Sequence, residues 1–318
     1  MARAPREHAN LRVISPRPWG EWLAGAAVAL VLIWLVWTVL DTPTLDLASI
    51  PRFLVMQAML VGVGQTLILT AVAMAVGIVL GLLSAVAYLS SNRVLRAVAW
   101  AYVWFFRGTP VLVQLIFWFN IGIVFKNISI GIPFGPELFS VPTNDLITPI
   151  SAAILGLGLN EGAYMSEIIR SGVMSVDSGQ VEAARALGMS KAKSLRVVIL
   201  PQALRIIVPP TGNELIGMLK TSALASVISV TELLGASSRI YSANLKVVEV
   251  LAAASIWYLL LTSLLSLGQY FLERRLAIGS GLVPSAMPGA SLFRGRRRAA
   301  VSTERDGDDR IAVARSAV

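Results

Sequence analysis

A few ionisable and amide side chains lie within otherwise apolar segments, and these residues are the best placed to do chemistry. Asn160 and Glu161 occur in one such segment, and Glu214 and Lys220 occur in a later one. Ionisable groups inside a bilayer are costly, so they require a partner or a cavity. Two carboxylates and an ammonium group around one cavity would suit a zwitterion such as an amino acid. An internal Glu–Lys network that pins helices together explains the same residues, and both interpretations remain open.

The residue inventory argues against catalysis. The chain has no cysteine, and its one histidine, His8, lies in a polar leader. Thiolate chemistry, a histidine-ligated metal site and a histidine-based triad are therefore excluded. The sequence also contains no Gly-x-x-x-x-Gly-Lys-Ser/Thr phosphate loop, so we expect no P-loop ATP hydrolysis and no bound cofactor in this chain. An intramembrane enzyme is the functional class that the sequence supports least.

Long apolar runs must position these side chains. Hydrophobic residues make up 56% of the 318 residues and charged residues only 14%, and the mean hydropathy is +0.72. This composition indicates a multi-span membrane protein, because about 20 apolar residues cross a hydrocarbon core of about 30 Å. We therefore expect an all-helical, polytopic membrane bundle of about six transmembrane helices, at roughly residues 22–40, 60–88, 109–125, 148–169, 205–229 and 250–272.

The two carboxylates have similar expected depths in the membrane. Glu161 lies nine residues from Arg170, and Glu214 lies nine residues from Arg205, where each basic residue marks the inner end of a span. Nine helical residues correspond to about 13 Å. Because the fourth and fifth spans run in opposite directions, the two carboxylates can flank one cavity near the midplane, a common substrate position in transporters. Glu167, three residues before Arg170, instead fits a helical ion pair at the interface.

The distribution of basic residues predicts the orientation of the chain. If the N-terminus is cytoplasmic, most of the 27 basic residues fall on inner segments, and the outer segments hold only Arg52, Lys126, Arg239 and Lys246. Lys and Arg accumulate on the cytoplasmic side of membrane proteins, so both termini are expected there. This asymmetry accounts for the net charge of +9, so we expect a lipid bilayer and no nucleic acid as the partner of these charges.

Glycine and proline give two local expectations. Gly77 and Gly81, spaced by four residues, allow another helix to approach closely, although a flexible lipid-facing pair would have the same spacing. Pro209 and Pro210 are expected to interrupt the helix of the fifth span, because each removes a backbone hydrogen bond.

Residues 92–110 interleave arginines with apolar residues, which suits a helix lying on the inner membrane surface. Thr109 and Pro110 then supply an N-cap and a first-turn proline for the third span. Under this interpretation Arg107 and Gly108 lie at the cytoplasmic face, and the Arg107-Gly108-Thr109-Pro110 run has a structural role.

A polar, basic island between apolar segments is expected to fold outside the lipid. Glu182, Ala183 and Ala184 should open a short helix, Gly188 should end it in a left-handed conformation, and Pro201 should stop the segment after Gly188. The small side chains allow this helix to sink into the groove of a partner. An amphipathic membrane-surface helix without a partner is the alternative interpretation.

The pattern Glu-Ala-Ala, three residues, Gly, nine residues, Val198, one residue, Leu200-Pro201 resembles the cytoplasmic loop of ABC importer permeases, which grips the ATPase subunit. Arg107-Gly108-Thr109-Pro110 is similar to a signature of the polar amino-acid branch of that family. The similarity extends from about residue 58 to 275. It includes residues 162–172, 179–180, 200–203, 209–210, 213, 219–222, 226, 232–233 and 272–276.

The resemblance implies a type I importer permease that takes up polar amino acids. It implies that the coupling contacts come from Glu182, Ala183, Ala184, Arg185, Gly188, Leu200 and Pro201. The implied partners are a cytoplasmic ATPase dimer that uses ATP, an extracytoplasmic solute-binding protein, and a second permease copy or a similar permease. The implied location is the bacterial inner membrane. The alternative from another class is a secondary carrier or channel driven by an ion gradient, with Glu161 or Glu214 as the proton site.

The chain divides into three expected parts. Residues 1–57 form a cytoplasmic leader, an extra first transmembrane helix and an outer loop. Residues 58–275 form the transmembrane domain, which contains a cytoplasmic coupling loop at 171–204. Residues 276–318 form a disordered cytoplasmic tail, because their Gly, Ser, Ala, Arg and Asp composition cannot build a core.

The absence of cysteine makes the predicted orientation directly testable. Single cysteines introduced at Ser190 and Ser302 should resist an impermeant thiol reagent applied to intact cells stripped of any outer barrier. A cysteine introduced at Ser140 should react under the same conditions. Labelling of Ser190→Cys from outside would reverse the orientation and remove the argument for a cytoplasmic docking loop.

Overall fold

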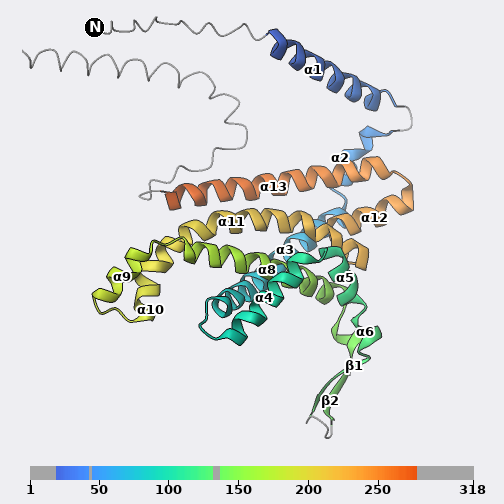
Figure 1. The fold of residues 1–318 in the computed structure, drawn as a ribbon. Coiled ribbons are helices and arrows are strands. Elements are labelled where there is room, and N and C mark those ends of the chain that lie inside the picture. The colour runs from blue at the N-terminus through green and yellow to red at the C-terminus, as the bar shows by residue number, and fades with distance from the viewer. Residues whose placement is uncertain (1–18, 43–44, 132–136, 278–318) are drawn as a thin grey trace, which may run out of the picture.

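The computed structural model describes residues 19–42, 45–131 and 137–277. Most of these residues are helical, and the longest helices run side by side in one bundle (Figure 1). The bundle contains α2 (Ile50–Leu54), α3 (Gln57–Tyr88), α4 (Arg93–Gly108), α5 (Val111–Phe119), α8 (Pro149–Met174), α11 (Leu200–Thr221), α12 (Leu233–Asn244) and α13 (Val247–Ala277). The expected fold class is confirmed, since the chain is mostly helical with several candidate membrane spans.

Two helices are long and apolar enough to cross a membrane, and they cover Gln57–Tyr88 and Val247–Leu276. Two bent pairs raise this number to four if each pair forms one span. They are Arg93–Gly108 with Val111–Phe119, and Lys191–Ile228 with Leu233–Asn244. α8 is 26 residues long, but its glycines and polar side chains make it less apolar. α1 (Trp19–Leu40) contains a shorter apolar stretch and lies apart from the bundle in Figure 1. The count of six spans stays a prediction.

The closest helix pair in the bundle is α3 with α8, and glycines on both helices make this contact possible. A Cβ at Gly77 would lie 2.5 Å from Cγ of Glu161, and a Cβ at Gly81 would lie 2.9 Å from the backbone nitrogen of Ser166. On the opposite helix, a Cβ at Gly158 would lie 2.7 Å from Cγ1 of Val76. The expectation that Gly77 and Gly81 admit another helix is therefore confirmed, and the lipid-facing alternative is wrong.

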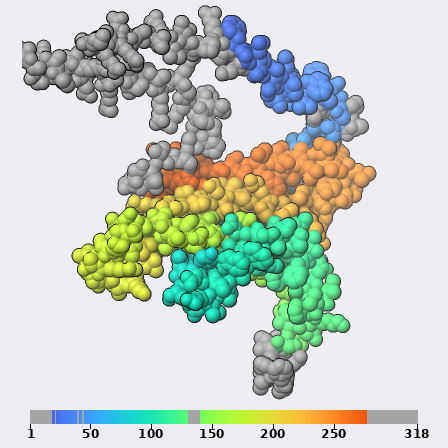
Figure 2. Space-filling view, in the orientation of Figure 1, coloured from blue at the N-terminus to red at the C-terminus, as the bar shows by residue number. Residues whose placement is uncertain are grey.

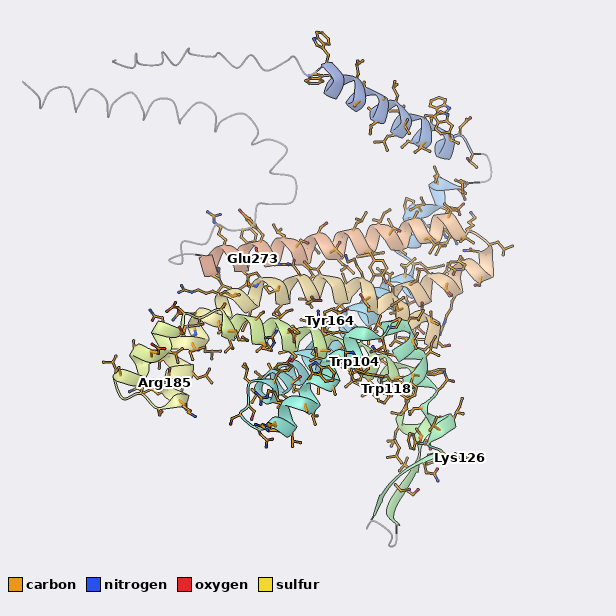
Figure 3. All side chains as sticks on the ribbon, in the orientation of Figure 1. Trp104, Trp118, Lys126, Tyr164, Arg185 and Glu273 are labelled. Carbon is orange, nitrogen blue, oxygen red and sulfur yellow. The ribbon has the colours of Figure 1, made fainter. Side chains whose placement is uncertain are left out.

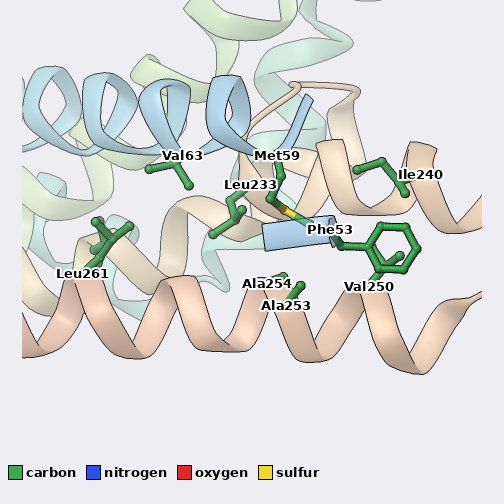
Figure 4. Packing of buried hydrophobic residues seen from close by; sticks show 10 residues of the cluster. Phe53, Met59, Val63, Leu233, Ile240, Val250, Ala253, Ala254 and Leu261 are labelled. Carbon is green, nitrogen blue, oxygen red and sulfur yellow. The ribbon is translucent and has the colours of Figure 1, made fainter. Parts of the chain in front are cut away.

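A hydrophobic cluster joins the other side of α3 to α2, α12 and α13 (Figure 4). It consists of Phe53, Met59, Val63, Leu219, Leu233, Ile240, Val250, Ala253, Ala254 and Leu261. Two polar links lie beside it: Lys246 forms a salt bridge with Asp46, and the Asp46 amide donates to Glu249. The hydrogen bond from Lys246 lowers the pKa of Asp46 below its ordinary value. These contacts attach the segment after α1 to the start of α13.

The third expected span is not one helix. α4 and α5 meet at a bend of 102°, and α6 (Ile121–Val124) is separate from α5. The predicted cap is also wrong, because Pro110 and not Thr109 occupies the N-cap position of α5. The hydroxyl of Thr109 donates back to the Phe105 carbonyl and accepts from Gln114, which closes the elbow between the two helices.

The fifth expected span differs in two respects from the prediction. Pro209 and Pro210 lie inside α11 without interrupting it, because α8 and α13 pack along that helix and Gln269 of α13 donates to the Pro209 carbonyl. Pro201 does not stop the preceding segment either. A π-turn, η2 (Leu195–Ile199), widens the backbone just before it, so the proline is accommodated in the first turn of α11.

The break in this region comes later, between η3 (Ser222–Ile228) and α12. Ser229 adopts a left-handed conformation with φ of 67°. The fully buried Glu232 then caps α12, since its carboxylate accepts from the amides of Leu234 and Gly235 and from the Tyr258 hydroxyl. Thr66 of α3 accepts from the Leu233 amide. Contacts from α3 and α13 therefore hold the bend of 48° that separates α12 from α11.

An antiparallel hairpin of β1 (Asn127–Gly131) and β2 (Glu137–Pro142) projects from the bundle (Figure 1). Its backbone pairing runs from Asn127 opposite Pro142 to Gly131 opposite Glu137. The all-helical expectation missed it, although Asn127-Ile128-Ser129-Ile130 has the alternation of a strand. The hairpin and the short helices α9 (Ser178–Ala186) and α10 (Lys191–Ser194) lie at opposite ends of the bundle.

The α3–α8 contact predicts a sharp difference between two glycines on α3. Gly81→Ala should lower the free energy of unfolding by about 1–3 kcal/mol, because the added methyl group collides with the backbone of α8. Gly64→Ala is the matched control, since a Cβ at Gly64 meets nothing within 4 Å. Denaturant unfolding of the purified protein measures both. Equal stability of the two variants would contradict the close packing.

Candidate functional site

A cavity of about 340 Å³ lies between α5, α8 and α11. Its lining combines apolar, amide, carboxylate and phenol groups from residues that lie far apart in the sequence. They are Val111, Leu157, Asn160, Glu161, Tyr164, Glu214, Gly217, Met218 and Thr221. The structure therefore brings Asn160, Glu161 and Glu214 together in the lining of one cavity, and the last two are the pair for which the sequence predicted a shared cavity. Figure 3 places Tyr164 in the middle of the bundle.

Glu161 is the most constrained residue of this lining. Its side chain is only 5% exposed, and Gly77 lets α3 press against its Cβ and Cγ. Within the described part of the chain, its Oε1 atom has no hydrogen-bond partner. Burying an unpaired polar oxygen costs free energy, so this atom is suited to accept a hydrogen bond from a bound molecule.

Glu214 and Asn160 complete the polar part of the cavity in different ways. Glu214 is half-buried and faces the same space from α11. The amide nitrogen of Asn160 donates to the Phe106 carbonyl at 2.8 Å. Asn160 therefore ties the C-terminal end of α4 to the cavity wall.

Lys220 does not join these residues. Its side chain is exposed and does not line the cavity. Among the residues that the structure describes, the ion pairs are Arg170 with Glu167 and Lys246 with Asp46, and neither involves Lys220. The helical ion pair predicted for Glu167 and Arg170 is confirmed, with 2.7 Å between the two charged groups.

Arg107 lies beside the middle of α8, and its predicted place at the cytoplasmic face stays a prediction. Its guanidinium carbon lies 5.1 Å from the ring centroid of Tyr164, halfway along α8, and not at the inner end of the helix. The reason is that α4 packs against α3 and α8, and the Tyr102 hydroxyl donates to the Leu159 carbonyl at 2.7 Å. α4 therefore packs against the bundle, and its position on the inner membrane surface stays a prediction. The sequence analysis also missed Tyr164, although it follows Glu161 by one helical turn.

The segment after α8 forms a small lobe at one end of the molecule (Figure 2). α9 begins at Ser178, one turn earlier than expected, because the carboxylate of Asp177 caps it by accepting from the Gly179 amide. α9 ends as predicted, with Gly188 in the left-handed region at a φ of 72°. The Gly188 and Met189 amides donate to the carbonyls of Arg185 and Ala184, which is a Schellman arrangement.

Most of the surface of α9 is open. Ala184 is buried against the rest of the lobe, whereas Glu182, Ala183 and Arg185 are exposed and Leu187 is 82% exposed. Figure 3 shows Arg185 on this lobe, far from Tyr164. Leu200 and Pro201 lie where the lobe joins α11, and the lobe is therefore attached directly to both α8 and α11.

The chain matches a known family of membrane transport proteins. Residues 77–278 match the family described as binding-protein-dependent transport system inner membrane component, and this is more than half of the chain. The chain therefore belongs to this family of membrane permeases. It is the membrane component of such a system and not its catalytic ATPase, and the family depends on separate partner proteins.

Two individual relatives with a known description are similar to most of the chain. The chain is 41% identical over 274 residues to the arginine transport system permease protein ArgU of Corynebacterium glutamicum, which covers 86% of this chain and 85% of the relative. It is 35% identical over 218 residues to the glutamine transport system permease protein GlnP of Escherichia coli, with 68% of this chain and 92% of the relative covered.

Among solved structures, an amino acid ABC transporter crystallised with histidines has a chain similar to this one. The TM-score is 0.62 with 35% identity, and the match covers 73% of this chain and 99% of that chain. An inward-facing methionine ABC transporter, MetNI, matches at 21% identity with a TM-score of 0.55, and that likeness concerns the fold alone.

Proposed function

We propose that the chain is the permease subunit of an ABC importer for polar amino acids, which pass through the cavity between Glu161 and Glu214. The observation that carries this proposal is the buried, unpartnered Oε1 of Glu161 in the wall of a cavity of about 340 Å³. A substrate ammonium group supplies the hydrogen bond that this oxygen lacks. The names of the arginine and glutamine permeases, and of the solved amino acid transporter, support an amino-acid substrate.

The competing structural interpretation required a Glu–Lys network in the membrane. Lys220 is exposed and does not line the cavity, and among the described residues it forms no ion pair with Glu161 or Glu214. Membership of a binding-protein-dependent family favours ATP-driven import over the secondary carrier or channel.

The lobe around α9 is the proposed docking site for a cytoplasmic ATPase dimer. Its exposed face carries Glu182, Ala183, Arg185 and Leu187, small or flexible side chains that suit insertion into a groove. Because α8 precedes the lobe and α11 comes after it, movement of the lobe reaches the helices that carry Glu161 and Glu214. ATP is then used only by the partner subunit.

The same proposal covers the arrangement of the complex. An extracytoplasmic solute-binding protein delivers the substrate, and a second permease copy or a similar permease completes the membrane unit. Both termini lie in the cytoplasm, residues 58–275 form the transmembrane domain with the loop 171–204, and residues 1–57 add the first helix. The family match at 77–278 supports a transmembrane domain in this part of the chain. The first two residues of the expected tail, Leu276 and Ala277, end α13, and the rest of the tail lies outside the described residues.

Glutamine substitutions test the substrate pathway. Glu161→Gln and Glu214→Gln should each lower the apparent affinity of uptake for amino acids or change which amino acid is preferred. The reason is that a hydrogen bond to a charged group contributes about 1.5–3 kcal/mol. Uptake by reconstituted complexes in vesicles measures this change. Glu167→Gln is the control, since Glu167 pairs with Arg170 and should leave apparent affinity unchanged. If Glu161→Gln and Glu214→Gln changed only thermal stability, the structural network would be the correct interpretation.

Coupling has its own test at Gly188. Gly188→Val should insert normally but lose substrate-stimulated ATP hydrolysis and uptake, because a β-branched residue at a φ of 72° adds about 1–3 kcal/mol of strain. Gly188→Asn should retain both activities, since asparagine tolerates the left-handed region. Glu182→Lys should weaken retention of the ATPase in pull-down measurements. Wild-type coupling in Gly188→Val and Glu182→Lys would show that the lobe is only a membrane-surface element.

A further inference from the structure

Arg107 stands at the elbow between α4 and α5, and the elbow is firmly held. The Phe106 carbonyl beside it accepts two hydrogen bonds, from Asn160 at 2.8 Å and from Gln114 at 3.0 Å. Gln114 also donates to the Thr109 carbonyl and hydroxyl. The backbone that carries Arg107 is therefore fixed relative to the cavity wall, because Asn160 lines the cavity.

The guanidinium of Arg107 points to the edge of the cavity. Its guanidinium carbon lies 5.1 Å from the ring centroid of Tyr164, which lines the cavity. Arg107 is exposed, and within residues 19–42, 45–131 and 137–277 it forms no salt bridge. Its planar set of N–H donors is thus held beside the cavity and free to bind an anion.

Three charged groups then lie at or beside this cavity: the carboxylates of Glu161 and Glu214 belong to its lining, and the guanidinium of Arg107 lies next to the lining residue Tyr164. When all three are ionised, the site carries one net negative charge. In a low-dielectric site, a ligand binds best when its charge cancels the net charge of the site and each ionised side chain has an oppositely charged partner on the ligand. A dibasic amino acid has a net charge of +1 and offers two cationic groups and one carboxylate, which matches the site group for group.

We propose that Arg107 binds the α-carboxylate of the substrate while Glu161 and Glu214 bind its two cationic groups, so that the preferred substrate is a dibasic amino acid. This inference rests on the proposed function and assigns a specificity-determining role to Arg107. Arginine is suited to the task, because its fork of donors matches a carboxylate in bidentate geometry. Stacking on Tyr164 holds that fork in place before the substrate arrives.

Substrate analogues separate the three contacts. Agmatine is arginine without the carboxylate, and citrulline is arginine with a neutral side chain. Each is added as a competitor against radiolabelled L-arginine in a binding assay on the purified, detergent-solubilised complex of permease and ATPase. Omitting the solute-binding protein ensures that only the permease discriminates. The variants are Arg107→Gln, Arg107→Lys and Glu161→Gln, with Arg96→Gln as the matched control on the same helix.

The wild type should prefer arginine over agmatine by tenfold to hundredfold, on the order expected for a charged hydrogen bond. Arg107→Gln should abolish this preference and keep the preference for arginine over citrulline. Glu161→Gln should instead lower the affinity for arginine, agmatine and citrulline alike, since all three carry the ammonium group that Glu161 binds. Arg107→Lys should retain part of the first preference, and Arg96→Gln should behave as the wild type. Thermal unfolding confirms that each variant is folded.

Two results would overturn the proposal on Arg107 alone. One is an unchanged preference for arginine over agmatine in a folded Arg107→Gln complex. The other is an equal loss of affinity for arginine and agmatine, which indicates that Arg107 only pins the elbow between α4 and α5. A wild-type complex that binds glutamine but neither arginine nor lysine would overturn the dibasic assignment and leave amino-acid import intact. A wild type that binds no amino acid would overturn the proposed function itself.

Discussion

The close approach of α3 and α8 is the constraint on which the rest of the structure depends. Gly77, Gly81 and Gly158 remove side chains at the points where the two backbones meet, so the helices pack more closely than larger residues permit. This contact fixes the depth and direction of Glu161, because Gly77 lies against its Cβ and Cγ. The cavity wall is rigid on this side, and the unpaired carboxylate oxygen is held in position without a polar partner.

The opposite side of the cavity is formed by elements that bend. α4 meets α5 at 102°, and α11 leads through η3 into α12 across a bend of 48°. Each bend is held by polar groups rather than by apolar packing alone: Gln114 and Asn160 at the first, and Glu232 with Thr66 at the second. Such hydrogen bonds are strong in an apolar environment, so they stabilise the two bends.

The lobe around α9 connects the α8 side of the cavity with the α11 side. It continues from α8, which belongs to the rigid contact, and leads through the π-turn η2 into α11, which ends at the bend. The π-turn accommodates Pro201, and the helix continues without a break from the lobe into α11. Under the proposed docking of an ATPase on the lobe, this continuous helix is the connection between the docking site and the cavity.

The sequence alone determined the class of the molecule, the long helices, the shared cavity of Glu161 and Glu214, the Glu167–Arg170 pair and the left-handed Gly188. These features follow from composition, helical periodicity and local backbone preference, which act over a few residues. The tertiary structure decided where α4 lies and that Arg107 and Tyr164 are in contact beside the cavity. It also decided that Lys220 does not line the cavity and that Pro209 and Pro210 leave α11 intact. Those outcomes depend on contacts between residues distant in the sequence, because packing against α3, α8 and α13 outweighs the local preference of any single segment.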